Sequence, residues 1–280
     1  MTKQSPNDVR DKIIRQLLGD KNLHEDKLYL QDFTRRLKRQ KSLPTLKLMD
    51  LRSCSLTRVP NLSSIAPDLE FLYLNGYPSL AEIPSLQNLS KLVELHMRCS
   101  KLIQPWSGGD KPLGSLKLMD LSYSCNLIRI PDLSSIAPNL EFLYLDNCKS
   151  LVEVPSFQNL SNLVELHMRY SKLTLAEIPS LQNLSNLVEL RMSSSQVKQP
   201  FRGDKHLGKL KLMDLSYTSN LIGIPDLSSI APNLEFSYLT GCWSLVEIPS
   251  LQNVSNLVEL LMRNIKPIKL WNGGDKPLRI

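Results

Sequence analysis

The amino-acid sequence predicts an α/β solenoid in which about ten short coils stack side by side, each adding one strand to a parallel sheet. The first observation behind this prediction is a leucine pattern, L-x-x-L-x-(L/M), whose starts recur every 23 or 24 residues from Leu46 to Leu257. The second is that one unit holds too few apolar positions to form a core, so neighbouring units must stack to bury them. The composition, 42% hydrophobic and 22% charged, is ordinary for a folded protein.

Three kinds of unit follow one another along the chain, and they read LKLMDLSYS, LEFLYLDNC and LVELHMRYS. Triplets begin at Leu46, Leu116 and Leu210, and the second interval is longer than the first by one unit. Residues 163–186 begin like the third kind and end like residues 80–91, so an unequal duplication explains the additional unit. The ten units start at Leu46, Leu69, Leu92, Leu116, Leu140, Leu163, Leu187, Leu210, Leu234 and Leu257.

Each unit is expected to form one short strand and one returning turn. The first six residues give the strand, with positions 1, 4 and 6 pointing into the core and positions 3 and 5 pointing outward. Small residues at position 9 are expected to satisfy neighbouring carbonyls. The Ile-Pro step, as at Ile130-Pro131 and Ile248-Pro249, removes an amide donor and disfavours a long helix. This period is typical of leucine-rich repeats, which predicts a horseshoe with a concave parallel sheet and a mostly non-helical convex side.

Residues 1–41 lack the repeat and are predicted to be a short helical N-terminal segment, followed by the leucine-rich-repeat domain at residues 42–280. A capped helix is expected at residues 5–18, and a second from 28 to about 38. Such a pair has little core of its own, so we expect it to cap the first coil. The basic run 35–41 is interpreted as a solvated helix face, with contact to an acidic partner or nuclear import as the alternatives.

The outward positions of the strands are expected to form continuous rows on the concave face, because the strands stack in register. Exposed aromatic side chains interleaved with Arg and Asp are typical of protein interfaces. The alternative is that duplication copied these residues with the scaffold and that nothing binds them. The candidate protein-binding residues are Asp50, Tyr73, His96, Asp120, Tyr144, His167, Arg191, Asp214 and Tyr238 at position 5, Phe71, Phe142 and Phe236 at position 3, and Arg98 and Arg169 at position 7.

The same rows argue against a metal site and against nucleic-acid binding. His96 beside Asp120, and His167 beside Asp146, each bring two candidate ligands together on adjacent strands, and two ligands do not make a closed site. Glu and Asp alternate with Arg along the face, whereas nucleic-acid binding favours a basic stripe with stacking aromatics. We therefore predict no metal ligand and no nucleic-acid partner.

No cofactor and no catalysis are predicted. The glycine-containing stretches at 106–113, 201–207 and 271–278 lack the spacing of a phosphate-binding loop, so they are interpreted as convex turns in which an aromatic residue covers the apolar edge. The four histidines of the chain show no accompanying nucleophile and acid in a recognisable motif. The expected partner is a protein, and the sequence leaves the oligomeric state open.

The sequence has features of a cytoplasmic protein with reduced thiols. It contains no run of 18 apolar residues, and its first residues have no apolar signal region. Its five cysteines, an odd number without paired spacing, fit free thiols better than a disulfide framework. We expect a cytoplasmic location, with the nucleus as the alternative, and no membrane contact.

Residues 42–280 resemble the repeat region of plant intracellular immune receptors that join a TIR domain, a nucleotide-binding domain and leucine-rich repeats. The phrases LVELHMRYSKL and KPLGSLKLMDLSYSCNLIRIPDLSSIAPNLEFLYLDNCKSLVEVPS carry this resemblance. Residues 9–41 are similar to the stretch of the nucleotide-binding domain between its phosphate loop and its acidic metal-binding strand. Neither that loop nor an Asp-Asp strand flanks them in this sequence, so the family's nucleotide switch is not expected to carry over.

The resemblance implies a non-catalytic protein-recognition module that binds a pathogen or host protein through its concave face in defence signalling. In the family, such repeats also hold the nucleotide-binding domain inactive until a ligand arrives. Two alternatives stay open: a nucleotide-dependent switch driven by ADP or ATP, and an adaptor or decoy that acts on a full-length receptor. Binding of ADP or ATP by the purified chain would favour the switch, and we expect none.

Overall fold

The computed structural model of the chain describes most of the repeat region. The described residues are 42–52, 61–76, 86, 88–103, 112–152, 154, 157, 159–173, 181–201, 206–224, 226–246 and 254–266. The predicted helical segment 1–41 and its basic run lie outside these residues, as do Trp106 and Trp271 of the predicted convex turns. The cap on the first coil therefore stays a prediction.

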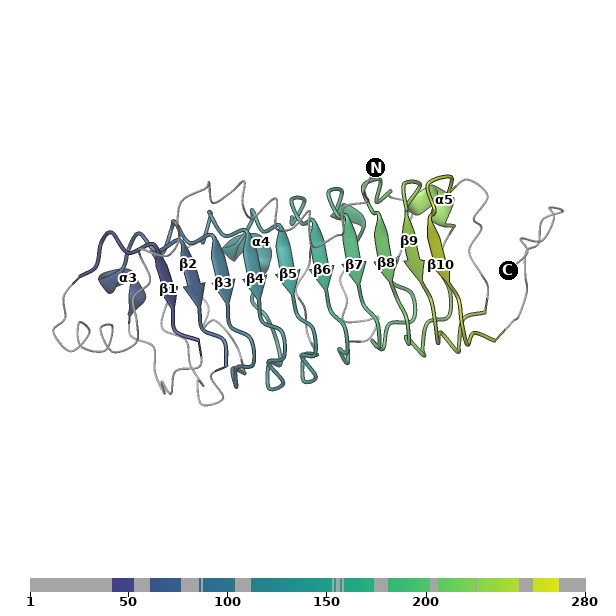
Figure 1. Cartoon of the computed structure of the whole chain (residues 1–280), viewed down its shortest axis with the longest axis horizontal. Coiled ribbons are helices and arrows are strands. Elements are labelled where there is room, and N and C mark those ends of the chain that lie inside the picture. The colour runs from purple at the N-terminus through teal and green to yellow at the C-terminus, as the bar shows by residue number, and fades with distance from the viewer. Residues whose placement is uncertain are drawn as a thin grey trace.

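The described residues contain ten short strands in one parallel sheet, whose strand order is the chain order (Figure 1). Each strand consists of positions 3 to 5 of its unit, so like positions pair across the sheet, from Leu48 opposite Phe71 to Phe236 opposite Glu259. This confirms the predicted leucine-rich-repeat solenoid. The strands are β1 (Leu48–Asp50), β2 (Phe71–Tyr73), β3 (Glu94–His96), β4 (Leu118–Asp120), β5 (Phe142–Tyr144), β6 (Glu165–His167), β7 (Glu189–Arg191), β8 (Leu212–Asp214), β9 (Phe236–Tyr238) and β10 (Glu259–Leu261).

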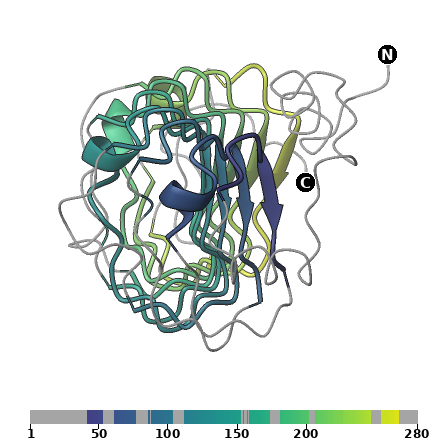
Figure 2. The ribbon, with the colours of Figure 1, turned by 90° about the vertical axis from the view of Figure 1, so that its left-hand side faces the viewer.

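The apolar core lies behind the sheet and forms one continuous cluster through the described coils. Positions 1, 4 and 6 supply much of it, as predicted; in one coil Leu116 and Met119 are 0% exposed and Leu121 is 1% exposed. Figure 2 looks along the stack and shows the strands on one side, with the returning segments enclosing the interior. Because each coil buries its leucines against its neighbours, contacts between adjacent coils stabilise the stack.

Small polar residues at position 9 join successive coils from the inside. The buried side chains of Ser124, Cys148, Thr218 and Cys242 each donate to the position-6 carbonyl of the preceding coil, at 3.2 to 3.3 Å. These four bonds are the satisfaction of neighbouring carbonyls that the sequence predicts. The prediction fails at Ser171 and Ser195, whose buried position-9 hydroxyls have no hydrogen-bond partner within the described residues. Burial raises the pKa of Cys148 to about 12 and that of Cys242 to about 11, so both thiols stay protonated and act as donors.

The returning segments contain only short helical turns within the described residues, as the Ile-Pro steps predict. Each α-turn begins after an Asn or Asp whose side chain accepts from a backbone N–H, as Asp132 does from Ser134 at 3.0 Å. Across the described part of the chain, no helix is long or apolar enough to traverse a membrane. The turns are α3 (Leu62–Ile65), α4 (Leu133–Ile136) and α5 (Leu227–Ile230), and the 3₁₀ turn η1 (Leu181–Asn183).

A turn follows the strands β2 to β10, and its position 8 adopts a left-handed backbone conformation. The position-8 N–H donates to the position-7 carbonyl of the next coil, as from Tyr123 to Asp146 at 2.7 Å and from Tyr217 to Thr240 at 2.6 Å. Glycine and asparagine suit this conformation better than bulky side chains do. The described position-8 residues with this conformation are Gly76, Cys99, Tyr123, Asn147, Tyr170, Ser194, Tyr217, Gly241 and Asn264, with φ between 54° and 82°.

Candidate functional site: the concave face

The concave face is the outer surface of the sheet, and every predicted candidate residue lies on it or in the turn directly after it. The register confirms the predicted rows, because Tyr73 lies beside His96 and His96 lies beside Asp120. The same row continues across the later strands, where His167 lies beside Arg191. Residues that are more than 20 positions apart in the chain therefore become neighbours in one row.

Several aromatic residues of this face are buried, whereas the sequence predicts that they are exposed. Phe71, Phe142 and Tyr144 are 5%, 3% and 7% exposed. Phe142 and Tyr144 pack with Leu118 in a small cluster that is separate from the main core. The prediction of exposure is wrong for these three aromatics. Side chains at like positions of adjacent strands stand next to one another on the face, so each one covers part of its neighbours. Phe236, near the end of the sheet, is half-buried.

A tyrosine, a glutamate and a histidine form a hydrogen-bonded group in the first triplet. The hydroxyl of Tyr73 donates to Glu94 Oε2 at 3.1 Å, and His96 Nε2 lies 3.2 Å from the same oxygen. The rings of Tyr73 and His96 meet edge to face, with centroids 4.8 Å apart. Burial and the Glu94 carboxylate raise the pKa of Tyr73 well above its ordinary value, so the hydroxyl remains a donor at neutral pH.

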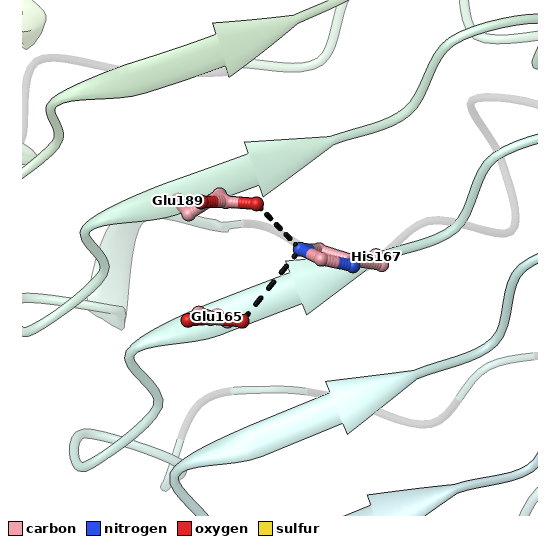
Figure 3. A group of neighbouring side chains, drawn as sticks. All are labelled: Glu165, His167 and Glu189. Carbon is pink, nitrogen blue, oxygen red and sulfur yellow. Dashed lines mark hydrogen bonds and ion pairs between the residues drawn. The ribbon is translucent and has the colours of Figure 1, made fainter. Parts of the chain in front are cut away.

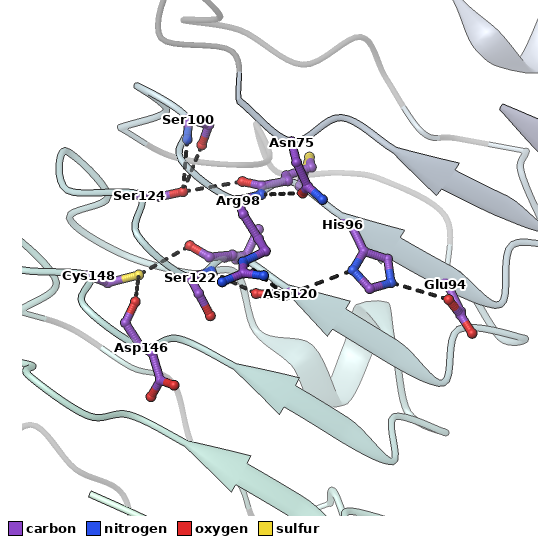
Figure 4. A network of polar contacts seen from close by, with 12 residues as sticks. Asn75, Glu94, His96, Arg98, Ser100, Asp120, Ser122, Ser124, Asp146 and Cys148 are labelled. Atoms are coloured by element: carbon purple, nitrogen blue, oxygen red, sulfur yellow. Dashed lines mark hydrogen bonds and ion pairs between the residues drawn. The ribbon is translucent and has the colours of Figure 1, made fainter. Parts of the chain in front are cut away.

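His96 connects this group to Asp120 on the next strand (Figure 4). His96 Nδ1 lies 3.8 Å from Asp120 Oδ2, and Arg98 Nε lies 3.5 Å from the same oxygen. Burial alone would lower the pKa of His96, but hydrogen bonds to Asp120 and Glu94 outweigh it and raise the pKa. Burial likewise favours the neutral acid at Asp120, yet hydrogen bonds from His96 and Ser122 lower its pKa. The imidazolium and the carboxylate therefore stabilise each other.

The second triplet repeats the group, and the coil after the duplicated unit extends it. The hydroxyl of Tyr144 donates to Glu165 Oε2 at 2.6 Å. His167 Nε2 lies 3.8 Å from Glu165 Oε2 and 2.8 Å from Glu189 Oε1. Arg191 Nε donates to that same Glu189 oxygen. Burial opposes ionisation of Glu189, but hydrogen bonds from His167 and Arg191 lower its pKa to about 2.

Glu165, His167 and Glu189 bring three possible metal ligands together, a grouping that the sequence analysis does not predict (Figure 3). Their donor atoms lie within 4.8 Å of one another. Both carboxylates already accept hydrogen bonds, Glu165 from Tyr144 and Glu189 from Arg191. A divalent cation would have to compete with the fixed charge of Arg191 for the same oxygen. The donor set therefore fits an ion-pair network better than a metal centre.

A hollow of about 300 Å³ opens on the concave face across β3 to β7. Positive and negative side chains alternate around it and are paired, as where Arg169 Nη2 and Nε lie 2.5 and 2.9 Å from Asp146 Oδ2. Asp146 thus pairs with Arg169, whereas the sequence predicts it beside His167. The residues that line the hollow are Arg98, Asp120, Ser122, Tyr144, Asp146, Glu165, His167, Arg169, Glu189 and Arg191.

Six of the predicted candidates line the hollow and the other eight do not. In the third triplet Tyr238 donates to Glu259 at 3.2 Å, but Leu261 stands where the other triplets have histidine. At the opposite end, Asp50 pairs with Arg52 at 2.5 Å. The candidates outside the hollow are Asp50, Phe71, Tyr73, His96, Phe142, Asp214, Phe236 and Tyr238.

Four carboxylates of the network are absent from the predicted site. Glu94, Glu165 and Glu189 stand at position 3, and Asp146 stands at position 7. These are the same outward positions that supply the candidate phenylalanines and arginines. A signal was therefore present: a carboxylate one strand away from an arginine or histidine on the same face is expected to pair with it.

The repeat and the parallel sheet together define this chain as a leucine-rich-repeat solenoid. No family model matches it. Over 221 residues its sequence is 38% identical to the disease resistance protein RPP4 of Arabidopsis thaliana. This match covers 78% of this chain and 18% of that protein. Over 83 residues it is 46% identical to the disease resistance protein RPV1 of Vitis rotundifolia, and this match covers 30% of this chain and 6% of that protein. The chain thus spans a small part of the length of the plant disease resistance proteins whose repeats it resembles.

The fold also matches a solved structure. The leucine-rich repeat domain of the type III effector XopL superposes with a TM-score of 0.50 over 94% of this chain and 89% of that chain. The two sequences are 19% identical, so this match supports the fold alone.

Proposed function

We propose that this chain is a non-catalytic recognition module that binds a protein partner, from a pathogen or from the host cell, through its concave face in plant defence. The similarity to plant disease resistance proteins supports the defence context. The hollow carries the proposal, because three arginines and four carboxylates converge there from consecutive coils. A volume of about 300 Å³ suits one or two inserted side chains of a partner better than a large small-molecule ligand.

The charged groups of the hollow are positioned for selective recognition. The strand register and the mutual pairs, such as Arg169 with Asp146, hold them in place before a partner arrives. A partner that offers a carboxylate to Arg169 or a cation to Asp146 gains charge-assisted hydrogen bonds, whereas a partner with the opposite arrangement meets like charges. Such a surface selects among partners more than it adds affinity.

The sharpest test reverses one ion pair without removing it. The double variant Asp146→Arg with Arg169→Asp keeps the net charge of the hollow and inverts the direction of the pair. A matched control, Lys211→Glu with Glu235→Lys, inverts a pair of 2.7 Å between adjacent coils away from the hollow. Both variants and the parent chain are used to recover partners from plant cell extract, and calorimetry then measures the affinity of the recovered protein.

We expect the inversion at residues 146 and 169 to weaken partner binding by about tenfold or more, because charges that met opposite charges then meet like ones. The control inversion is expected to leave the affinity within about twofold of the parent. Equal affinities for the parent and the 146/169 variant would place the partner outside the hollow and contradict the proposal.

A further inference from the structure

A second exposed surface runs along the edge of the sheet, in the turns that follow the strands. We call it the tyrosine edge, because Tyr123, Tyr170 and Tyr217 stand there at position 8, after β4, β6 and β8. They are 45%, 57% and 60% exposed. They occupy every second coil, so about 10 Å separates one from the next at the usual strand spacing.

The scaffold does not require tyrosine at these places. The left-handed backbone of position 8 disfavours a bulky side chain, and Asn147 and Ser194 adopt the same conformation on the intervening coils. The ring of Tyr217 lies against Gly241, where an added Cβ would stand 2.7 Å from Tyr217 Cδ1. The guanidinium of Arg98 lies 5.3 Å from the ring centroid of Tyr123. Strained residues of this kind are retained mainly where they serve a function.

Exposed lysines follow the position-8 residues on several of these coils. Lys101, Lys149, Lys172 and Lys198 are exposed, and none of them forms an ion pair within the described part of the chain. Asp146, on the same coil as Lys149, is buried and already paired with Arg169. The edge therefore attracts a negatively charged partner.

Aliphatic side chains stand beside the lysines. Ile103, Ile128 and Val152 are 59%, 38% and 45% exposed on three successive coils, and backbone hydrogen bonds of 3.0 Å join them. A single-stranded nucleic acid would use the tyrosines and the lysines, but it has no use for an aliphatic row. A protein segment can contact all three kinds of residue.

We propose that the tyrosine edge is a docking surface for an acidic segment of a partner protein, with apolar side chains between its carboxylates. The carboxylates lie against the four lysines. The apolar side chains pack on the tyrosine rings and on the aliphatic row. The edge adjoins the hollow where Arg98 lies against Tyr123, but none of its tyrosines, lysines or aliphatic residues lines the hollow. This interaction therefore goes beyond the proposed function, and each can fail without the other.

The first test measures the affinity of a fluorescently labelled synthetic peptide of glutamate and leucine by anisotropy at low salt. The triple variant Lys101→Glu, Lys149→Glu and Lys172→Glu is expected to bind it at least about tenfold more weakly, and added salt is expected to weaken binding by the parent. The matched control changes the net charge equally through Lys47→Glu, Lys91→Glu and Lys211→Glu, whose lysines are similarly exposed but lie outside the edge. The affinity of this control variant for the peptide is expected to stay within about threefold of that of the parent chain.

The second test replaces the three tyrosines by asparagine, which already stands at position 8 as Asn147 and Asn264. We expect binding of the same peptide to weaken by about fivefold or more without a lower melting temperature. The inversion at residues 146 and 169 is expected to leave peptide binding unchanged, which separates the two surfaces. No saturable peptide binding, equal binding by the lysine variant, or tighter binding of an oligouridylate of equal charge would overturn the proposal, the last by identifying a nucleic-acid site.

Discussion

The concave face and the tyrosine edge belong to the same coils, yet they hold their polar residues in opposite ways. On the concave face, Glu189 is buried against Arg191, and Asp146 is buried against Arg169. On the tyrosine edge, Lys172 is exposed and has no ion-pair partner within the described residues. The sheet thus brings polar side chains within reach of one another, whereas the turns hold them apart. Charges on the face should therefore stabilise the fold, and charges on the edge should remain free for a partner.

The largest expected contrast comes from removing one cation from each surface. Arg191→Ala leaves the buried Glu189 carboxylate without its arginine, and we expect the free energy of unfolding to fall by about 3 kcal/mol. Lys172→Ala removes an exposed cation and should change the free energy of unfolding by less than about 0.5 kcal/mol. Urea titrations followed by circular dichroism measure both values. Similar losses in the two variants would remove the distinction between the surfaces.

Acid should weaken the concave network in a defined range of pH. The pKa of Glu189 is about 2 in the folded chain and 4.5 ordinarily, so its ionised form stabilises the fold above about pH 4.5. That contribution, at most about 3 kcal/mol, is lost as the pH falls from 4.5 towards 2. Glu189→Gln should flatten this part of the stability profile measured by urea denaturation. If the free energy of unfolding falls equally in the parent and the variant as the pH is lowered, Glu189 is not the group responsible for the loss of stability in acid.

A smaller effect is expected on the tyrosine edge, at Gly241. Its φ is +73° and an added Cβ would meet Tyr217 Cδ1 at 2.7 Å, so Gly241→Ala should lower the free energy of unfolding by about 1.5 kcal/mol. Adding Tyr217→Ser removes the contact but not the backbone strain, and should recover part of the loss. If Gly241→Ala is neutral in thermal unfolding, the turn accommodates side chains freely and the tyrosines are not held there under strain.

The smallest effect concerns His96 near neutral pH. Although burial opposes its charged form, hydrogen bonds to Asp120 and Glu94 raise its pKa. Its contribution to stability is therefore complete below its ordinary pKa and is lost as the pH rises through the raised value. His96→Gln should abolish this dependence in thermal unfolding between about pH 5.5 and 8.5. His206→Gln, which changes an exposed histidine, is the control and should leave the dependence in place.

The leucine period was sufficient to predict the fold, because it fixes which positions point into the core. Strands such as Leu118–Asp120 lie where the pattern places them. The inward hydrogen bonds of Ser124 and Cys148 were predictable for the same reason, since a small polar residue at a buried position needs a nearby carbonyl. Strand positions and inward hydrogen bonds depend only on the repeated unit and on its stacking in register, so they can be predicted from one sequence.

Properties that depend on contacts between different rows could not be predicted in the same way. The burial of Phe142 depends on its neighbours Leu118 and Tyr144, and the pattern states only that it points outward. The left-handed turn did have a signal, because Gly241 and Asn147 stand in the same column as the tyrosines. Aligning position 8 across the units would have revealed it.

The duplicated unit gives the concave face two unequal intervals. Tyr73 lies on β2, Tyr144 on β5 and Tyr238 on β9, so three strand steps separate the first pair and four separate the second. At about 4.8 Å per step, these intervals are about 14 and 19 Å. Turning a rigid binder end for end would exchange the long and short spans, so a molecule that contacts all three of these strands at the same position fits in one orientation only. A single extra coil thus gives direction to an array of nearly identical parts.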